Sequence, residues 1–161
     1  DVKFGGIEEA VARAEAAPHA FTIEGACPEK SYLNGATFSY RGHTASGAPA
    51  YESSDGGLHL FHDPSCNGRD AVARWVIDNE APNSTAASDL DQDRQCNYHA
   101  RIDSGTTSRP PTRATWSMYC GGAWKDVALT LSEAPAERGI ETMAVVSSAS
   151  RPGRWVAAAA A

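Results

Sequence analysis

The chain has 161 residues, the length of one ordinary domain with a single hydrophobic core. Hydrophobic residues make up 42% of it and charged residues 21%, which excludes a disordered or fibrous chain. Fourteen basic and 20 acidic side chains give a net charge of -6, and this balance argues against nucleic acid or an anionic lipid surface as a partner. No apolar run approaches the roughly 18 residues of a spanning helix, so no transmembrane segment is predicted.

Residues 7–17, IEEAVARAEAA, predict a helix near the N-terminus. The segment is rich in strong helix formers, has glutamates in its first turn and stops before Pro18. Ile7 and Val11 recur at helical spacing and form a narrow apolar stripe that suits packing on another surface. We therefore expect residues 1–25 to form an N-terminal helical arm.

From about residue 31 the pattern changes to short alternating apolar runs separated by Gly, Pro, Asn, Asp and Ser, which is typical of an antiparallel β protein. Seven strands are predicted, beginning at Ala36, Pro49, Leu58, Ala73, Tyr98, Thr115 and Asp126. The fold class expected for residues 26–133 is therefore mainly β, a small antiparallel β-sandwich or barrel of about seven strands.

Two segments fall outside this strand pattern. Residues 79–96 form a long stretch between the fourth and fifth predicted strands, and loops of that length are usually functional or irregularly ordered. Residues 134–161 predict an extended C-terminal arm. Its last five residues, 157–161, are an unbroken alanine run, either a helical tail or backbone of unassigned sequence, and no function is inferred from them.

The four cysteines, Cys27, Cys66, Cys96 and Cys120, are even in number and widely spaced, with no CxxC pair. This spacing does not suggest a zinc or thioredoxin-like site, and disulfides are the preferred interpretation over four free thiols. Three connectivities are open to four cysteines, and we favour Cys66 with Cys96 and Cys27 with Cys120. Each bridge would contribute about 3 to 5 kcal/mol by restricting the unfolded chain. Disulfides predict an oxidising compartment, either an organelle lumen, for example the thylakoid lumen, or the cell exterior.

Asp89, Asp91 and Asp93 place carboxylates at alternate positions of the long loop, a spacing that can converge on a hard cation such as calcium. An EF-hand is rejected, because its sixth and twelfth positions are Arg94 and Ala100 instead of glycine and glutamate. Calcium is the only cofactor that the sequence suggests. A solvated acidic loop is the alternative interpretation.

No catalytic motif is present: there is no GxSxG elbow, no P-loop and no GxGxxG fingerprint. His59 and His62 are three apart in a predicted strand and would point to opposite faces, which does not favour a shared metal. Glycoside hydrolysis needs a pair of carboxylates, but a chain with 20 acidic residues contains such pairs by chance, so their presence does not indicate this activity. The chain is therefore not expected to be an enzyme.

Aromatic residues occur on both faces of the predicted strands, where most of them are expected to form core contacts. Those that face outward could stack a sugar ring or anchor a partner protein. The candidates for partner or ligand binding are Phe38, Tyr40, Trp116 and Trp155. In the long loop, Asn83 begins an Asn-Ser-Thr triplet and is a candidate glycosylation site.

The function favoured by these patterns is that of a non-catalytic accessory, linker or scaffolding subunit of a larger protein assembly. The lumenal side of a photosynthetic or other membrane complex is one expected setting, with the chain peripheral to the membrane. Under this hypothesis the two arms bind other protein subunits. The alternative is a secreted carbohydrate- or ligand-binding β module, which requires an aromatic groove with exposed rings.

Overall fold

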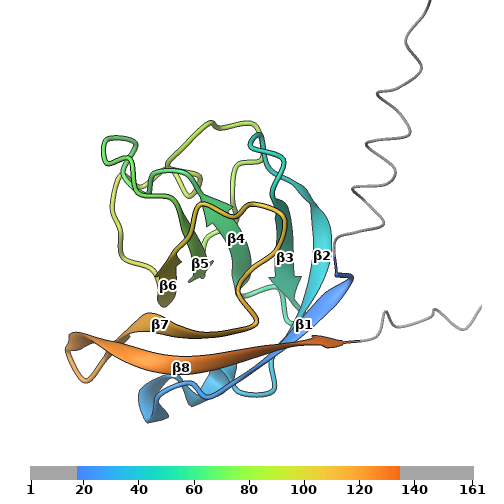
Figure 1. Cartoon of the computed structure of the whole chain (residues 1–161), viewed down its shortest axis with the longest axis vertical. Coiled ribbons are helices and arrows are strands. Elements are labelled where there is room, and N and C mark those ends of the chain that lie inside the picture. The colour runs from blue at the N-terminus through green and yellow to red at the C-terminus, as the bar shows by residue number, and fades with distance from the viewer. Residues whose placement is uncertain (1–17, 135–161) are drawn as a thin grey trace, which may run out of the picture.

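In the computed structural model, which describes residues 18–134, eight antiparallel strands close into a barrel (Figure 1). Each strand pairs with the next one in the chain, and the last pairs with the first. The strands are β1 Ala20–Glu24, β2 Thr37–His43, β3 Pro49–Ser53, β4 His59–Asp63, β5 Arg74–Asp78, β6 Ala100–Asp103, β7 Arg113–Cys120 and β8 Ala123–Ala134. A short 3-10 helix, η1, covers Pro28–Leu33. Within the described residues, no helix is long and apolar enough to cross a membrane.

The expected class, mainly β and antiparallel, is confirmed, and all seven predicted strands are present within a few residues. The count was one too low, because β1 lies in the segment that we had assigned to the N-terminal arm. Phe21 and Ile23 alternate with more exposed residues, but five residues are too few to show a period clearly. The predicted helix over 7–17 and the arm beyond residue 134 lie outside the described residues.

Pairing of β1 with β8 turns the predicted sheet into a barrel. Ala20 lies opposite Ala134 and Glu24 opposite Thr130, so β8 uses its C-terminal end for closure and the longer part before it to pair with β7. Closure leaves neither β1 nor β8 as an edge strand, which removes an unpaired row of backbone groups. Residues 18 and 134 therefore leave the barrel at neighbouring positions (Figure 1).

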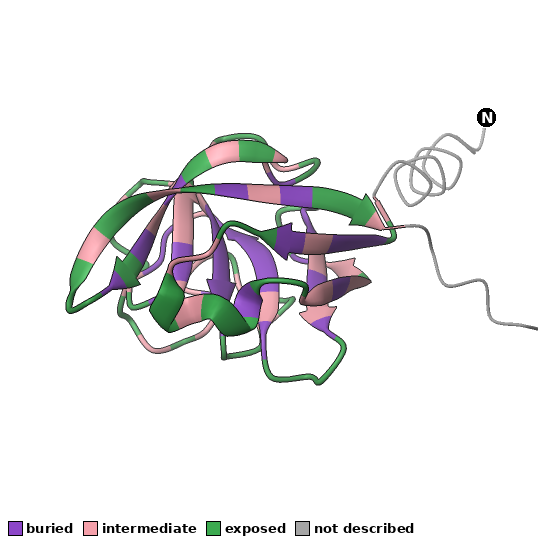
Figure 2. Cartoon of the chain, turned by 90° about the horizontal axis from the view of Figure 1, so that it is seen from below, coloured by how far each residue is buried: buried purple, intermediate pink, exposed green. Residues whose placement is uncertain are grey.

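Large side chains fill the barrel interior. Buried residues alternate with more exposed ones along β7, as the period of two requires, whereas β4 and β5 are buried on both faces (Figure 2). The fully buried side chains of the main core include Phe21, Phe38, Tyr51, Leu60, Trp75, Trp116 and Met118.

Our expectation that Phe38 and Trp116 belong to a binding surface is therefore wrong, because both are 0% exposed in the barrel interior. The alternation was interpreted correctly, but the sequence does not show which face of a strand closes around the core. Tyr40 shares the inward side of β2 with Phe38, and its ring packs on Tyr51 at a centroid distance of 6.1 Å while its hydroxyl bonds His43 Nδ1 at 2.7 Å.

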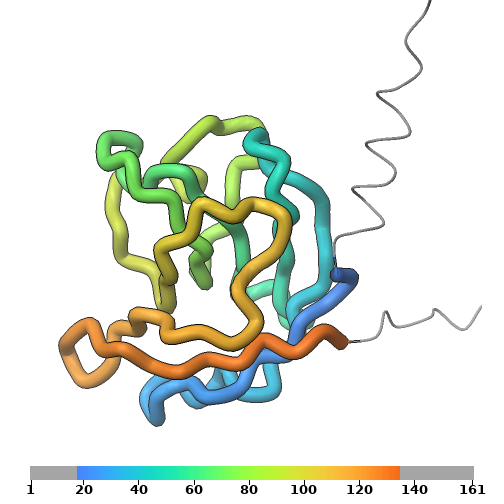
Figure 3. Tube along the Cα trace, in the orientation of Figure 1, coloured from blue at the N-terminus to red at the C-terminus, as the bar shows by residue number. Residues whose placement is uncertain are grey.

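A second, smaller core lies outside the barrel wall, between β4–β5 and the long connection from β5 to β6. Phe61 and Val76 face outward from the two strands, and Leu90 and Tyr98 of the connection cover them. Figure 3 follows this connection around the barrel. The Cys66–Cys96 disulfide, with Cα atoms 5.2 Å apart, fastens it. The long loop is therefore anchored by apolar burial as well as by a covalent bridge.

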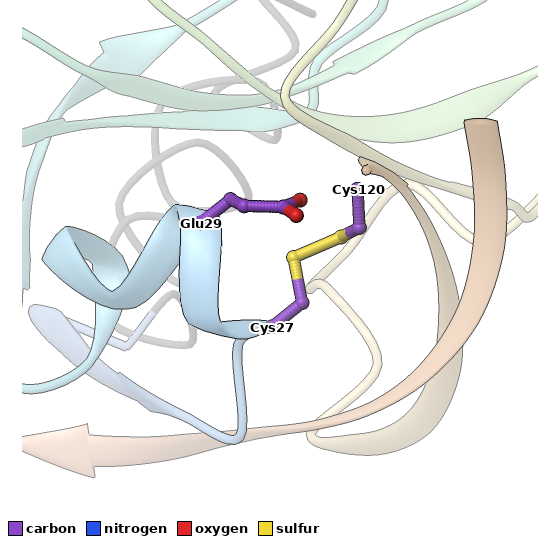
Figure 4. A group of neighbouring side chains, drawn as sticks. All are labelled: Cys27, Glu29 and Cys120. Atoms are coloured by element: carbon purple, nitrogen blue, oxygen red, sulfur yellow. A yellow bond between two sulfur atoms is a disulfide. The ribbon is translucent and has the colours of Figure 1, made fainter. Parts of the chain in front are cut away.

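The η1 helix is fastened to the tip of the β7–β8 hairpin. Cys27, just before η1, bonds Cys120, the last residue of β7, and Glu29 accepts a hydrogen bond from the Gly121 N–H (Figure 4). Gly121 and Gly122 adopt φ values of 62° and 79°, as a tight two-residue hairpin requires. The structure thus has the disulfide pairing that we favoured, and both bridges accord with an oxidising compartment.

Candidate ligand-binding site

A pocket of about 490 Å³ opens on the outer surface between η1, the end of the long loop and the β7–β8 hairpin. Its volume falls in the range of small-molecule sites. We call it the aromatic pocket; its lining residues are Lys30, Gln95, Cys96, Asn97, Tyr98, His99, Tyr119 and Trp124. The two disulfides hold its walls, because Cys96 lies in one wall and the Cys27–Cys120 bridge joins the other two.

Tyr119 and Trp124 lie opposite each other across the hairpin and project from the outer face of the barrel. Their rings meet edge to face, with centroids 5.7 Å apart, and the Tyr119 side chain is 48% exposed. The Arg101 guanidinium lies over the Trp124 ring, 4.0 Å from its centroid, and donates a hydrogen bond to the Cys96 carbonyl. This cation–π contact holds the indole in place from one face.

His99 connects η1 to the long loop at the side of the pocket. Its Nδ1 lies within hydrogen-bond distance of the Tyr32 hydroxyl and 3.4 Å from Lys30 Nζ, while its Nε2 lies 3.3 Å from Asn79 Oδ1. Burial and the nearby Lys30 charge lower the pKa of His99. The imidazole is therefore neutral at neutral pH, with Nδ1 accepting from η1 and Nε2–H donating to Asn79.

The lining combines flat rings with polar groups that suit binding more than bond cleavage. Gln95 and Asn97 offer amide donors and acceptors, and Lys30 offers an ammonium group. No carboxylate lines the pocket, and its only cysteine, Cys96, is in a disulfide. A ring-shaped polar ligand could stack on an aromatic face while the surrounding groups bind its hydroxyls.

In the acidic loop, the three carboxylates lie close together, as their spacing in the sequence suggested. One carboxylate oxygen from each of Asp89, Asp91 and Asp93 lies within 4.8 Å of the others. Asp89 accepts a hydrogen bond from the Arg94 N–H, but both buried oxygens of Asp91 have no partner among the described residues. Burial, then the charges of Asp93 and Asp78, raise the pKa of Asp91 to about 7. Calcium binding here stays a prediction, since the same crowding is relieved when Asp91 takes up a proton.

Of the remaining predicted site residues, Asn83 does not line the aromatic pocket. Asn83 is half-buried in the long loop, where its side-chain oxygen accepts hydrogen bonds from the N–H and hydroxyl of Thr85. Trp155 lies outside the described residues. A different pocket of about 430 Å³, lined by Arg41, Glu52 and His59 among others, occupies the outer face of β2–β4.

Tyr119 and Trp124 were not among the residues that we singled out. The segment YCGGAW contains a signal for this arrangement. Its two glycines favour a two-residue turn, and Tyr119 stands as far before the first glycine as Trp124 stands after the second. That symmetry places the two rings opposite each other on one face of a hairpin. Their exposure could not be predicted, because it depends on barrel closure and on η1.

Comparison of the chain with protein-family models, with curated proteins and with solved structures finds no match. The class of molecule is defined by the fold alone: an eight-stranded antiparallel barrel in which each strand neighbours the next in the chain. Because barrels of this kind serve many purposes, function has to be inferred from the site.

Proposed function

We propose that this protein is a non-catalytic carbohydrate-binding module and that the aromatic pocket is its binding site. The observation that carries the proposal is the Tyr119–Trp124 pair, which projects from a disulfide-braced hairpin into a pocket of about 490 Å³. Of the two functions considered from the sequence, this geometry favours the ligand-binding module. The segments through which an accessory subunit was expected to bind its partners lie largely outside the described residues.

Sugar recognition requires one apolar face for the ring and several polar groups for the hydroxyls. Trp124 offers the largest flat surface in the pocket, and Arg101 fixes its orientation from one face. Gln95, Asn97 and His99 supply donors and acceptors around it. Because two disulfides hold the walls in place, little order would have to be gained on binding, which favours affinity.

Two features support a binding role over catalysis. The lining has no carboxylate pair of the kind that glycoside hydrolysis uses. Moreover, the barrel interior is filled by side chains such as Phe21, Trp75 and Trp116, so a ligand would have to bind on the outer surface. We place this activity in an oxidising compartment, secreted or in an organelle lumen such as that of the thylakoid.

The proposal is tested by screening the full chain on an array of neutral and charged glycans and measuring the strongest ligand by calorimetry. Trp124→Ala should weaken binding by about 10- to 100-fold, the contribution expected of one stacked aromatic ring. His59→Ala, in the pocket on β2–β4, is the control and should bind as the wild type does. Equal affinity of wild type and Trp124→Ala, or no bound glycan, would reject carbohydrate binding at this site.

A second candidate function is that of an accessory subunit attached to other protein subunits, with the chain peripheral to a membrane complex. One observation favours it: β1 and β8 pair so that residues 18 and 134 leave the barrel side by side, which lets two flanking segments reach one partner. Crosslinking mass spectrometry on native material tests it. Crosslinks from Lys3 to a single assembly would support attachment, and a monomer without crosslinks would oppose it.

A further inference from the structure

The charge of the aromatic pocket has the opposite sign to that of the whole chain. The protein carries a net charge of -6, yet Lys30 is the only lining residue with a full charge at neutral pH. No ion pair involves Lys30 among the described residues. Its neighbour Glu29 accepts a hydrogen bond from the Gly121 N–H at the hairpin tip instead (Figure 4). The pocket therefore holds an ammonium group that makes no ion pair with the described residues; burial lowers the pKa of Lys30 by more than the nearby Glu29 charge raises it.

A second cation, Arg101, lies beside the Trp124 ring of the pocket. The Arg101 guanidinium stacks over Trp124 and makes no ion pair with any described carboxylate, whereas the neighbouring Arg74 pairs with both Asp70 and Asp103. Lys30 thus lines the same pocket as Trp124, and Arg101, on the adjoining strand β6, lies over the Trp124 ring. Both would attract an anion toward the ring, and low ionic strength would strengthen that attraction.

We propose that the aromatic pocket selects sugars that carry one negative substituent, a uronate carboxylate or a sulfate ester. The sugar ring stacks on Trp124, and the anionic group binds Lys30 Nζ. This inference rests on the proposed carbohydrate-binding function and names the class of ligand for the same site. An ammonium group accepts either anion because it is a point charge without a preferred planar geometry.

The experiment compares three probes on the full chain by calorimetry at low and physiological salt: oligogalacturonate, a sulfated galactan oligosaccharide and an uncharged galactan oligosaccharide. The wild type should bind one or both charged probes at least about tenfold more tightly than the uncharged one, as one charge-assisted hydrogen bond implies. The preferred charged probe shows whether carboxylate or sulfate is the recognised group.

Three variants assign the effect to Lys30. Lys30→Gln should lose the preference for charged probes while keeping its affinity for the uncharged one, and Lys30→Arg should restore much of the preference. Lys125→Gln removes the same net charge from an exposed lysine that does not line the pocket, so it should behave as the wild type does.

The outcomes separate this inference from the proposed function. Equal affinity of the wild type for charged and uncharged probes would overturn the selectivity for anions and leave carbohydrate binding intact. Equal losses in Lys30→Gln and Lys125→Gln would also overturn it, because they would indicate a general charge effect. Binding of none of the probes, together with an array without hits, would overturn both.

Discussion

Tyr51 and Tyr98 are both buried to about the same extent, but only Tyr98 has a hydrogen-bond partner for its hydroxyl. The Tyr98 hydroxyl donates to Asp63 Oδ2 at 3.0 Å, and this carboxylate also accepts the N–H groups of Ser65 and Leu90. Asp63 is therefore the polar centre that joins the end of β4 to the long loop. The Tyr51 hydroxyl lies in the barrel interior without a partner among the described residues.

This difference predicts opposite effects of the same substitution. Tyr98→Phe should lower the free energy of unfolding by about 1.5 to 3 kcal/mol, because it removes a hydrogen bond to a buried charge. Tyr51→Phe should leave stability unchanged or raise it slightly, because it removes an unpartnered buried hydroxyl. Urea denaturation of both variants measures the two effects. A larger loss for Tyr51→Phe than for Tyr98→Phe would contradict this view of the two hydroxyls.

Asp91 is an unfavourable residue in the described structure, because its buried carboxylate lies among other carboxylates. Asp91→Asn should therefore raise the unfolding temperature by several degrees in the presence of a chelator at pH 8. The matched control is Asp93→Asn, which should gain less, because its amide oxygen would accept the Gln95 N–H bond more weakly than the present carboxylate does. A lower unfolding temperature for Asp91→Asn would contradict the electrostatic account. Stabilisation of the wild type by added calcium, absent in Asp91→Asn, would support the predicted cation site.

At the scale of elements, the close approach of the β1–η1 connection to β8 depends on one glycine. Gly25 has a φ of 95°, and a Cβ atom there would lie 2.4 Å from the Ala128 carbonyl oxygen. Gly35 also has a positive φ, 78°, but a Cβ there would meet nothing within 4 Å. The first glycine is required by both conformation and space, and the second by conformation alone.

Gly35→Ala should cost about 1 to 2 kcal/mol, the usual strain of a left-handed residue with a side chain. Gly25→Ala should cost clearly more, because a backbone carbonyl must move and the β1–β8 pairing that closes the barrel moves with it. Thermal unfolding of the two variants provides the comparison. Similar losses in both would show that the β1–β8 contact adapts easily.

Strand prediction from the sequence succeeded where alternation was long and turn residues were frequent, as in β7 and β8. It failed for β1, whose five residues pair with β2 and with the distant β8 and owe their structure to that pairing. The same limit applies to Phe38 and Trp116. A period of two identifies the residues that share a face, but which face becomes the interior is decided by closure of the whole sheet.

At the scale of the whole molecule, the convergence of Asp89, Asp91 and Asp93 could be predicted, because the three residues belong to one loop. The favoured disulfide pairing agrees with the structure, but it was one choice among three connectivities, and Cys27 and Cys120 are separated by 93 residues in the sequence. The aromatic pocket could not be predicted. It requires η1, the end of the long loop and the β7–β8 hairpin to meet, and η1 lies far from the other two segments in the sequence. Only the local arrangement of Tyr119 and Trp124 across the hairpin was accessible from the sequence.

The central claim is that the outer aromatic pocket, and not the barrel interior, binds a carbohydrate. The most direct test is a two-dimensional NMR titration of the labelled chain with the strongest glycan from the array. Chemical-shift changes should centre on Asn97, His99, Tyr119 and the indole N–H of Trp124, while the indoles of Trp75 and Trp116 in the core stay unchanged. Changes confined to those core indoles, or to the pocket around Arg41 and His59, would contradict the account.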